Sequence, residues 1–178
     1  MATRRPSARS TTSVSRGKRT RRAAPLPDRP DRVRTLAKDL TKEFPRSPRV
    51  VLGGYVIVAR CIDKARAELA GTQGDYTYYP CSLCRLWFDF TGITPAALKR
   101  AVATGATDEE LGVWIASQSK VTAPDAILRW NNRMRELRPS QLPLKTQRFL
   151  EDYIPKNLPP NRPVYVYFDV YDLEERRY

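Results

Sequence analysis

The most regular pattern of apolar and polar positions lies in the segment 48–70. Its apolar residues recur every three or four positions, which is the spacing of one face of an α-helix. Ser47 can cap this segment, Pro48 suits a first helical turn, and Gly71 can end it. We therefore predict one long helix over 48–70. Its apolar face consists of Val51, Tyr55, Val58, Ile62, Ala65 and Leu69, and its polar side carries Arg60, Asp63, Lys64 and Arg66.

Five further segments are predicted to be helical from the same spacing. They are 82–91, 95–104, 107–119, 124–138 and 144–154. Their ends carry suitable residues: Gly92 can close one helix, Pro95 can open the next, and Thr107 and Glu110 can form a capping box. The predicted fold class is mainly α, a compact helical domain of five to six helices.

The segment 164–173 follows a different pattern. Apolar residues alternate with more polar ones from Val164 to Val170, which is the period of a β-strand. The aromatic segment 75–80 is its only visible strand partner. We predict a minor two-stranded β element formed by 75–80 and 164–171, and a buried helix over the second segment is the alternative.

Composition changes the picture at the N-terminus. The chain of 178 residues has a net charge of +13, of which residues 1–30 carry +8. These residues include almost no large apolar side chains, so they cannot bury enough surface to offset the entropy of ordering. We expect a disordered basic arm over 1–30, followed by a single helical domain over 31–178.

The basic arm is a candidate for nucleic-acid binding, because arginine and lysine displace the counterions of phosphates. The alternatives are a solubilising tail, an organelle transit peptide, or upstream sequence added by a misassigned start. A second basic patch lies at Arg129, Arg133, Arg135 and Arg138, for which a solvated or salt-bridged helix face is the favoured interpretation. The densest basic cluster of the arm consists of Arg16, Lys18, Arg19, Arg21 and Arg22.

Two absences limit the class of function. No apolar stretch reaches about 18 residues, and the N-terminus lacks the apolar core of a secretory signal. We therefore expect a cytoplasmic protein without a membrane partner. The chain contains no histidine, which excludes hydrolases that need an imidazole base and metal sites with a histidine ligand.

The most specific local motif is Cys81-Ser-Leu-Cys84. This spacing occurs in redox-active dithiols and in halves of zinc sites. Cys61 is the only other thiol, so a tetrahedral zinc site would need a carboxylate, a water or a second chain. Cys81 and Cys84 are therefore weak metal candidates, ordinary packing cysteines are the alternative, and no cofactor is predicted.

A longer run of residues carries a resemblance to a known family. The order DLTK, PRSP, LGGY and IDKARA between residues 39 and 67 resembles the signature of an uncharacterised bacterial family, a domain of unknown function of small helical proteins. The resemblance extends over about residues 36–175. It implies a mainly helical cytoplasmic domain and brings no established activity, cofactor or catalytic residue. The CxxC motif is not part of the family pattern.

The same region supplies a candidate ligand site. Lys42 and Arg46 precede the predicted start of a helix, where free backbone N–H groups favour an anion. Helix caps and salt bridges explain the same residue types, and they are the alternative. The candidate ligand-binding residues are Lys42, Arg46, Tyr55, Arg60, Asp63 and Lys64.

The function predicted from the sequence is a non-enzymatic binding or regulatory module. Two alternatives remain open: nucleic-acid association through the arm, and an enzyme or sensor for a small anionic ligand at residues 42–64. Without histidine, an enzyme would have to use Asp, Lys, Tyr or Cys as its acid or base. Nothing in the spacing selects one of these residues, so no catalytic residue is assigned.

Overall fold

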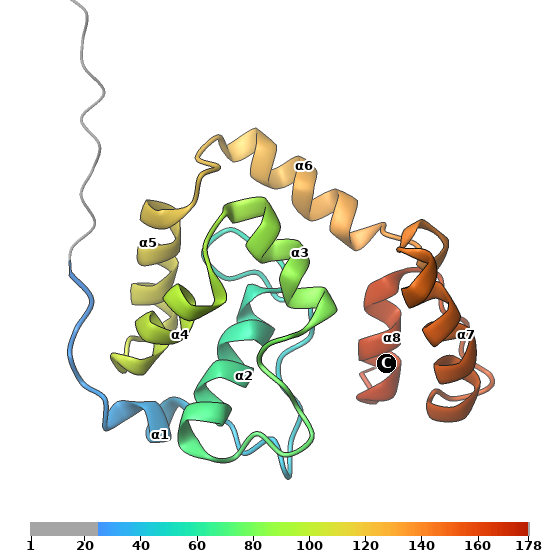
Figure 1. Ribbon diagram of the computed structural model, residues 1–178, viewed down its shortest axis with the longest axis horizontal. Helices are drawn as coiled ribbons and strands as arrows, with labels where there is room; N and C mark the ends of the chain where they lie inside the picture. The colour runs from blue at the N-terminus through green and yellow to red at the C-terminus, as the bar shows by residue number, and fades with distance from the viewer. Residues whose placement is uncertain (1–24, 178) are drawn as a thin grey trace, which may run out of the picture.

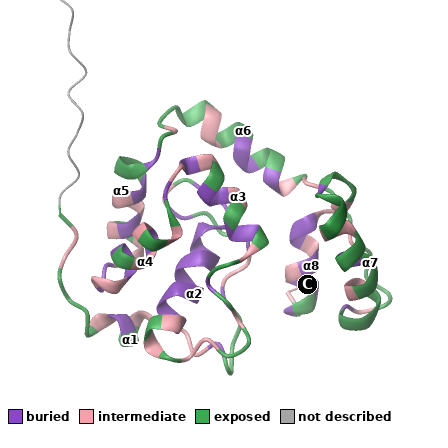
Figure 2. Cartoon of the chain, viewed as in Figure 1, coloured by how far each residue is buried: buried purple, intermediate pink, exposed green. Residues whose placement is uncertain are grey.

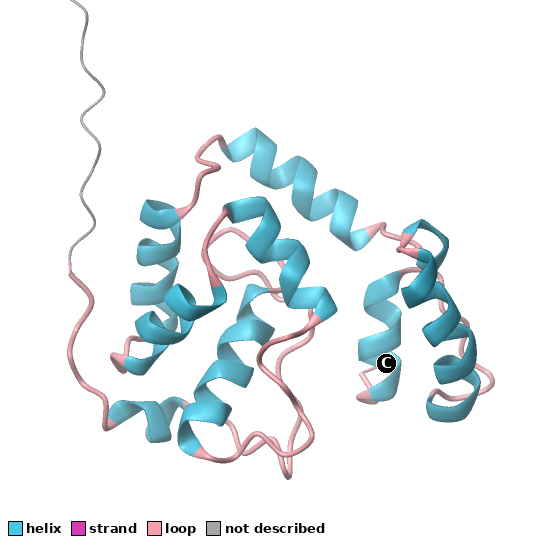
Figure 3. Ribbon diagram, in the orientation of Figure 1, coloured by secondary structure: helices cyan, strands magenta, loops and turns pink. Residues whose placement is uncertain are grey.

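The computed structural model describes residues 25–177, and these form helices and loops with no strand (Figures 1 and 3). The mainly α class is confirmed, although this part of the chain has eight α-helices where five to six were predicted. A 3-10 turn, η1, spans Pro139–Gln141. The α-helices are α1 (Arg32–Leu36), α2 (Val58–Ala70), α3 (Ser82–Thr91), α4 (Pro95–Ala103), α5 (Asp108–Gln118), α6 (Pro124–Arg135), α7 (Leu144–Asn157) and α8 (Tyr167–Glu174).

Helix α2 lies at the centre of the fold, packed against α1, α3 and α4. Every residue from Val58 to Ala67 is buried (Figure 2). Gly71 ends the helix in the left-handed conformation, with φ of 75°, which glycine adopts without a steric penalty. Because α2 is covered on all sides, its polar face also lies against protein.

The predicted start of this helix at Pro48 is wrong. Residues 48–57 are not helical, and Leu52 and Tyr55 exchange two backbone hydrogen bonds of 3.0 Å around a tight turn. Gly53 and Gly54 form its tip with φ of 57° and 87°. The turn buries apolar residues at nearly helical spacing, so periodicity alone could not separate it from a helix.

Capping residues set the boundaries of α4 and α5 as the sequence predicted. The Thr94 hydroxyl accepts a hydrogen bond of 3.1 Å from the backbone N–H of Ala97 at the start of α4. At the start of α5, the Thr107 hydroxyl accepts from the Glu110 N–H at 3.2 Å, while the Glu110 carboxylate accepts from the Thr107 N–H at 2.8 Å. This reciprocal pair satisfies two N–H groups that the helix itself cannot.

Aromatic side chains fill the core between α2, α3 and α6. Trp87 is fully buried and meets Tyr55 edge to face, with ring centroids 6.1 Å apart. Phe90 stacks on Trp130 at 4.8 Å. Such rings contribute the largest apolar areas to a core. This cluster packs α3 and α6 against residues 52–55, which we call the LGGY turn, and Asn131 of α6 adds hydrogen bonds to the Gly54 carbonyl and the Val56 N–H.

The predicted β element is also wrong, since neither 75–80 nor 164–171 forms a strand. Tyr167–Glu174 is α8, the buried helix that was the alternative. The Asp169 carboxylate accepts hydrogen bonds of 2.9 Å from the backbone N–H groups of Tyr165 and Val166, and this fixes the start of the helix. Tyr167, Phe168 and Val170 then pack inward, so the alternation ends where the helix begins.

Helix α7 is the least covered long helix, and Leu150 is its one buried residue. Most of its surface is exposed (Figure 2). Among residues 25–177, no helix combines the length and apolar character needed to cross a bilayer.

Candidate functional site

Four of the five charged residues of α2 are the starting point for a functional site, because they are buried, whereas Glu68 is partly exposed. Arg60, Asp63 and Lys64 are each 3% exposed, and Arg66 is 4% exposed. A buried charge is unfavourable unless a partner compensates it. The partners of each residue therefore show whether its role is structural or whether it is available to a ligand.

Asp63 and Arg66 belong to a closed ion cluster that joins α2 to α5. Arg46 Nη2 lies 2.7 Å from Asp63 Oδ1, and its Nη1 lies 2.5 Å from Asp108 Oδ2. Arg66 Nη1 reaches the other Asp108 oxygen at 2.8 Å. Although burial opposes it, the hydrogen bond and charge of Arg46 lower the pKa of Asp108. Two cations and two carboxylates balance each other, so this cluster is a structural joint.

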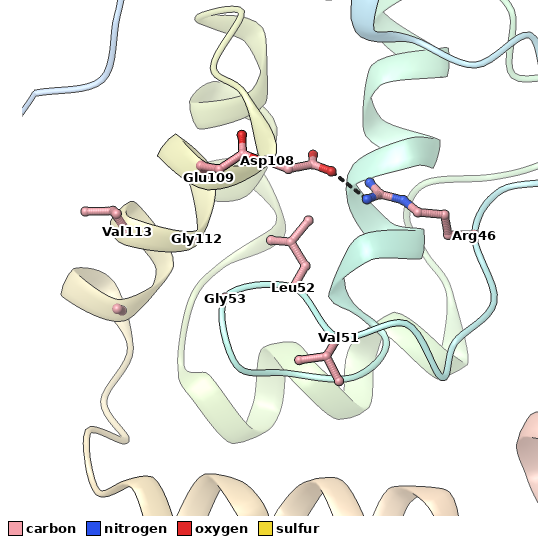
Figure 4. A pocket seen from close by; sticks show the side chains of 9 residues that line it. Arg46, Val51, Leu52, Gly53, Asp108, Glu109, Gly112 and Val113 are labelled. Atoms are coloured by element: carbon pink, nitrogen blue, oxygen red, sulfur yellow. Dashed lines mark hydrogen bonds and ion pairs between the residues drawn. The ribbon is translucent and has the colours of Figure 1, made fainter.

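A shallow groove of about 590 Å³ runs beside this joint, between the LGGY turn and α5 (Figure 4). The Arg46–Asp108 pair closes one end of it (Figure 4). Its walls are Leu52, Gly53 and Gly112, together with the exposed side chains of Val51 and Val113. The groove contains no buried polar group that lacks a partner, so nothing in it indicates a particular ligand.

Arg60 forms a second compensated pair, with Glu175 at the end of α8. Its Nη1 and Nη2 atoms donate to the two carboxylate oxygens at 2.8 and 2.5 Å. The guanidinium also lies over the rings of Tyr76 and Tyr171, 5.6 and 5.0 Å from their centroids, an arrangement that favours a cation. Burial, together with the charge of Glu175, raises the pKa of Tyr76 well above its ordinary value.

Lys64, one turn beyond Arg60, differs from its neighbours because no carboxylate pairs with it within the described part of the chain. Its Nζ donates to the Thr77 carbonyl at 2.9 Å and to the Cys81 Sγ at 3.0 Å. Burial lowers the pKa of Lys64, but the sulfurs of Cys84 and Cys81 outweigh this effect and raise the pKa above its ordinary value. The ammonium is therefore charged at neutral pH without a matching carboxylate.

A cleft of about 650 Å³ opens beside Arg60 and Lys64. We call it the Lys64 cleft; α2, α7, α8 and the loop between α2 and α3 contribute to its walls. Asp75 and Glu174 are its exposed acidic residues. Its remaining lining residues are mainly aromatic or apolar: Leu40, Phe44, Tyr76, Thr77, Pro80, Cys81, Tyr153 and Tyr171.

The six candidate ligand-binding residues do not share one site, and only Arg60 and Lys64 line the Lys64 cleft. Arg46 and Asp63 lie in the ion cluster with Asp108. Lys42 is exposed and pairs with Asp39 at 2.8 Å. Tyr55 is a core residue, 1% exposed, whose hydroxyl lies 3.0 Å from that of Ser119.

Cys81, Cys84 and Cys61 are free thiols. Among the described residues, no group of three or more Cys, Asp or Glu side chains is arranged to hold a metal ion. Cys81 is the N-cap of α3, and Cys84 lies one turn into the helix. A hydrogen bond with Cys84, together with burial, raises the pKa of the Cys81 thiol, and burial raises the pKa of Cys84 to about 12.

The candidate nucleic-acid residues Arg16, Lys18, Arg19, Arg21 and Arg22 lie outside the described residues. On α6, Arg129 pairs with Asp125 at 2.8 Å, and Arg135 donates to Asn132 at 3.0 Å. Arg133 and Arg138 are exposed beside a surface groove of about 510 Å³. Within the described residues, a carboxylate on the same helix thus neutralises one arginine of this patch, Arg129.

Sequence reasoning missed three residues that surround the Arg60 guanidinium beside the Lys64 cleft: Glu175, Tyr76 and Tyr171. Glu175 lies 115 positions from Arg60, and no local spacing connects them. Tyr171 was assigned to a strand, which hid its place on a buried helix facing α2. Only an expectation that two buried cations need anionic partners could have directed attention to the acidic residues near the C-terminus.

A comparison with protein families gives a clear match. The model of a domain of unknown function (DUF5069) covers residues 42–177, which include α2 to α8 and every residue of the Lys64 cleft except Leu40. None of the curated proteins matches the chain. The match confirms the family membership expected from the sequence, and the chain belongs to the DUF5069 family.

Proposed function

We propose that this protein is a binding module for a small anionic molecule, and that the ligand occupies the Lys64 cleft. The observation that carries the proposal is the buried Lys64 ammonium, which lines a cleft and lacks a carboxylate partner among the described residues. An ammonium has three N–H donors, and Thr77 and Cys81 occupy two. The third can bind an oxygen of the ligand.

The charges around the cleft favour a singly charged ligand. Arg60 is neutralised by Glu175, so Lys64 is the available cation. Asp75 and Glu174 on the exposed side would repel a ligand with several negative charges. Aromatic side chains such as Tyr153 and Phe44 offer apolar surface for the rest of the molecule. A monocarboxylate with an apolar or aromatic body fits this arrangement best.

Binding is favoured over catalysis by the titration of the partly or fully buried tyrosines and cysteine of the cleft, as distinct from its exposed carboxylates Asp75 and Glu174. The pKa values of Tyr76 and Tyr171 are raised by burial, and a hydrogen bond with Cys84 together with burial raises that of Cys81. All three are protonated near neutral pH, whereas a general base must be unprotonated there.

Three reduced thiols also suit the cytoplasm, the compartment we propose for the protein.

The test is thermal unfolding in the presence of acetate, benzoate, inorganic phosphate or a nucleoside monophosphate. We expect benzoate to stabilise the protein, by about 2.7 kcal/mol at a hundredfold excess over its Kd, and to do so more than phosphate does. Lys64→Gln should abolish the effect. Lys42→Gln is the matched control, because Lys42 is exposed and already paired with Asp39. Failure of every compound to stabilise the wild type, or an undiminished shift in Lys64→Gln, would contradict the proposal.

A second candidate function is nucleic-acid association through residues 1–30, supported by their charge of +8. Deleting residues 2–24 should remove most of the affinity for single- or double-stranded nucleic acid. It should also flatten the dependence of affinity on salt, because each lost cation reduces the number of released counterions. Equal affinity of the full and shortened chains would eliminate this function.

A further inference from the structure

The CxxC segment contributes a thiol to the Lys64 cleft that ligand binding alone does not explain. Cys81 lines the cleft, and its Sγ accepts a hydrogen bond of 3.0 Å from the Lys64 ammonium. The backbone N–H of Cys84 also points to this sulfur, at 3.5 Å. An ammonium and the N-terminus of a helix both stabilise a thiolate as it forms. Because Cys81 lines the cleft and is partly exposed, while the other two cysteines are buried, it is the thiol that a small oxidant can reach.

A second thiol lies directly behind the first. Cys84 is buried in the first turn of α3, and its thiol interacts electrostatically with those of Cys81 and Cys61. Two cysteines at the first turn of a helix, separated by two residues, can join in a disulfide. Cys81 is partly exposed, whereas Cys84 and Cys61 are buried. This order of exposure separates a thiol that meets solvent from one that can resolve its oxidised form.

We propose that Cys81 and Cys84 form a peroxide-sensitive dithiol, in which Cys81 is oxidised first and Cys84 then closes a disulfide with it. In the first step the Cys81 sulfur attacks one oxygen of hydrogen peroxide, the O–O bond breaks, and water leaves behind a sulfenic acid. In the second step the Cys84 sulfur attacks the Cys81 sulfur, the S–O bond breaks, and a second water leaves. The two sulfurs lose two electrons, the peroxide gains them, and both thiol protons end in water.

Lys64 has a defined part in this chemistry. Its ammonium stabilises the Cys81 thiolate that attacks the peroxide, and it remains beside the sulfur after the disulfide has formed. The oxidation site shares the cleft with the proposed ligand site, but it does not depend on ligand binding. Each proposal can therefore fail without the other.

The experiment uses the full chain, reduced and then freed of reductant, before treatment with hydrogen peroxide, denaturation and alkylation. We expect one of the three thiols to remain alkylatable. Because Arg66 and Arg85 bracket the pair without an intervening Lys or Arg, trypsin releases Cys81 and Cys84 in one peptide. This peptide should lose the mass of two hydrogens, whereas the separate Cys61 peptide should stay alkylated.

Variants identify the role of each sulfur. Cys84→Ser removes the resolving thiol, so the Cys81 sulfenic acid should accumulate and react with dimedone. Cys61→Ser is the matched control and should form the disulfide as the wild type does. Three alkylatable thiols after peroxide treatment, or a disulfide that contains Cys61, would overturn the proposal. Should Cys84→Ser fail to fold, the peptide map of the wild type decides the question alone.

Discussion

Arg60 and Lys64 lie one helical turn apart, yet their charges are compensated in different ways. Arg60 has a bidentate carboxylate partner in Glu175, and both side chains are almost completely buried. Lys64 has a carbonyl and a thiol as its acceptors. Removing one member of a buried ion pair leaves the other uncompensated, which costs more than removing both. The two residues therefore call for different experiments.

Loss of Glu175 should strongly destabilise the protein. Glu175→Ala leaves the Arg60 guanidinium buried without its carboxylate, and we expect the free energy of unfolding in urea to fall by about 3–5 kcal/mol. The double variant Arg60→Met/Glu175→Leu should lose less. Asp89→Ala is the control, because the Arg85–Asp89 pair is exposed and should contribute less than about 1 kcal/mol. Equal losses in Glu175→Ala and Asp89→Ala would refute this assignment.

Oxidation of Cys81 should accelerate as the pH rises. The hydrogen bond with Cys84 and burial raise the pKa of Cys81 far above neutral, whereas Lys64 acts in the opposite direction. Tyr167 and Tyr171 of α8 also interact with this sulfur, and their raised pKa values leave them neutral. Since the thiolate is the reactive form, the peroxide rate should rise about tenfold per pH unit between about pH 7 and 9. The rate is measured by quenching samples with an alkylating reagent at timed intervals. A rate that does not change with pH would mean that Cys81 is already ionised.

At the scale of elements, the LGGY turn brings the chain just before α2 into close backbone contact with α5. An ideal Cβ at Gly53 would lie 3.1 Å from the Cα of Gly112 in α5, whereas a Cβ at Gly54 meets nothing within 4 Å. Both glycines have positive φ, so an alanine at either position is strained. Only Gly53 adds a steric conflict with the neighbouring helix.

The two glycines should therefore respond differently to alanine. We expect Gly54→Ala to lower the free energy of unfolding by about 1–2 kcal/mol through strain alone. Gly53→Ala should cost roughly 1 kcal/mol more, because the turn and α5 must separate. Thermal or urea unfolding measures both. If Gly54→Ala were the more damaging change, the close approach of the two backbones would not matter for stability.

The joint between Arg46, Arg66 and Asp108 should make stability depend on pH. The pKa of Asp108 is lowered from its ordinary value of 3.8 in the folded protein, so the pairing stabilises at higher pH and is lost as the pH falls through the folded-state pKa. Asp108→Asn should cost roughly 2–3 kcal/mol at neutral pH. The difference from the wild type should shrink below about pH 4. Asp125→Asn, in the first turn of α6 and fully exposed, is the control and should show a much smaller change.

For the whole molecule, the sequence predicted those features that local spacing determines. The helices with clear start signals, such as α4 and α5, begin where Pro95 and Thr107 indicate. The LGGY turn and α8 were misassigned, because both bury apolar residues at spacings that fit another element. In the site, Arg60 and Lys64 were recognised from their residue types. Their partners were not, because Thr77 and Glu175 are brought to α2 only by the assembled fold.

The C-terminal segment ties distant parts of the molecule together by charge. Arg49, next to the LGGY turn, pairs with Asp169 and Asp172 of α8 at 2.5 and 2.8 Å. Arg177 interacts with Glu175, the partner of Arg60. The Arg49 pairs join α8 to the segment before the LGGY turn. Through Glu175, Arg177 is linked to Arg60 of α2. Residues 169–177 therefore complete a charge network that begins around α2.

The Arg60–Glu175 pair also has a consequence for synthesis in the cell. Glu175 is synthesised 115 positions after Arg60. Until it emerges, the nascent α2 carries a guanidinium that cannot be buried without its counter-charge. Closure of the core around α2 must therefore wait until Glu175 has left the ribosome, and a chain that stalls or is truncated before Glu175 should be degraded rather than accumulate as a folded fragment.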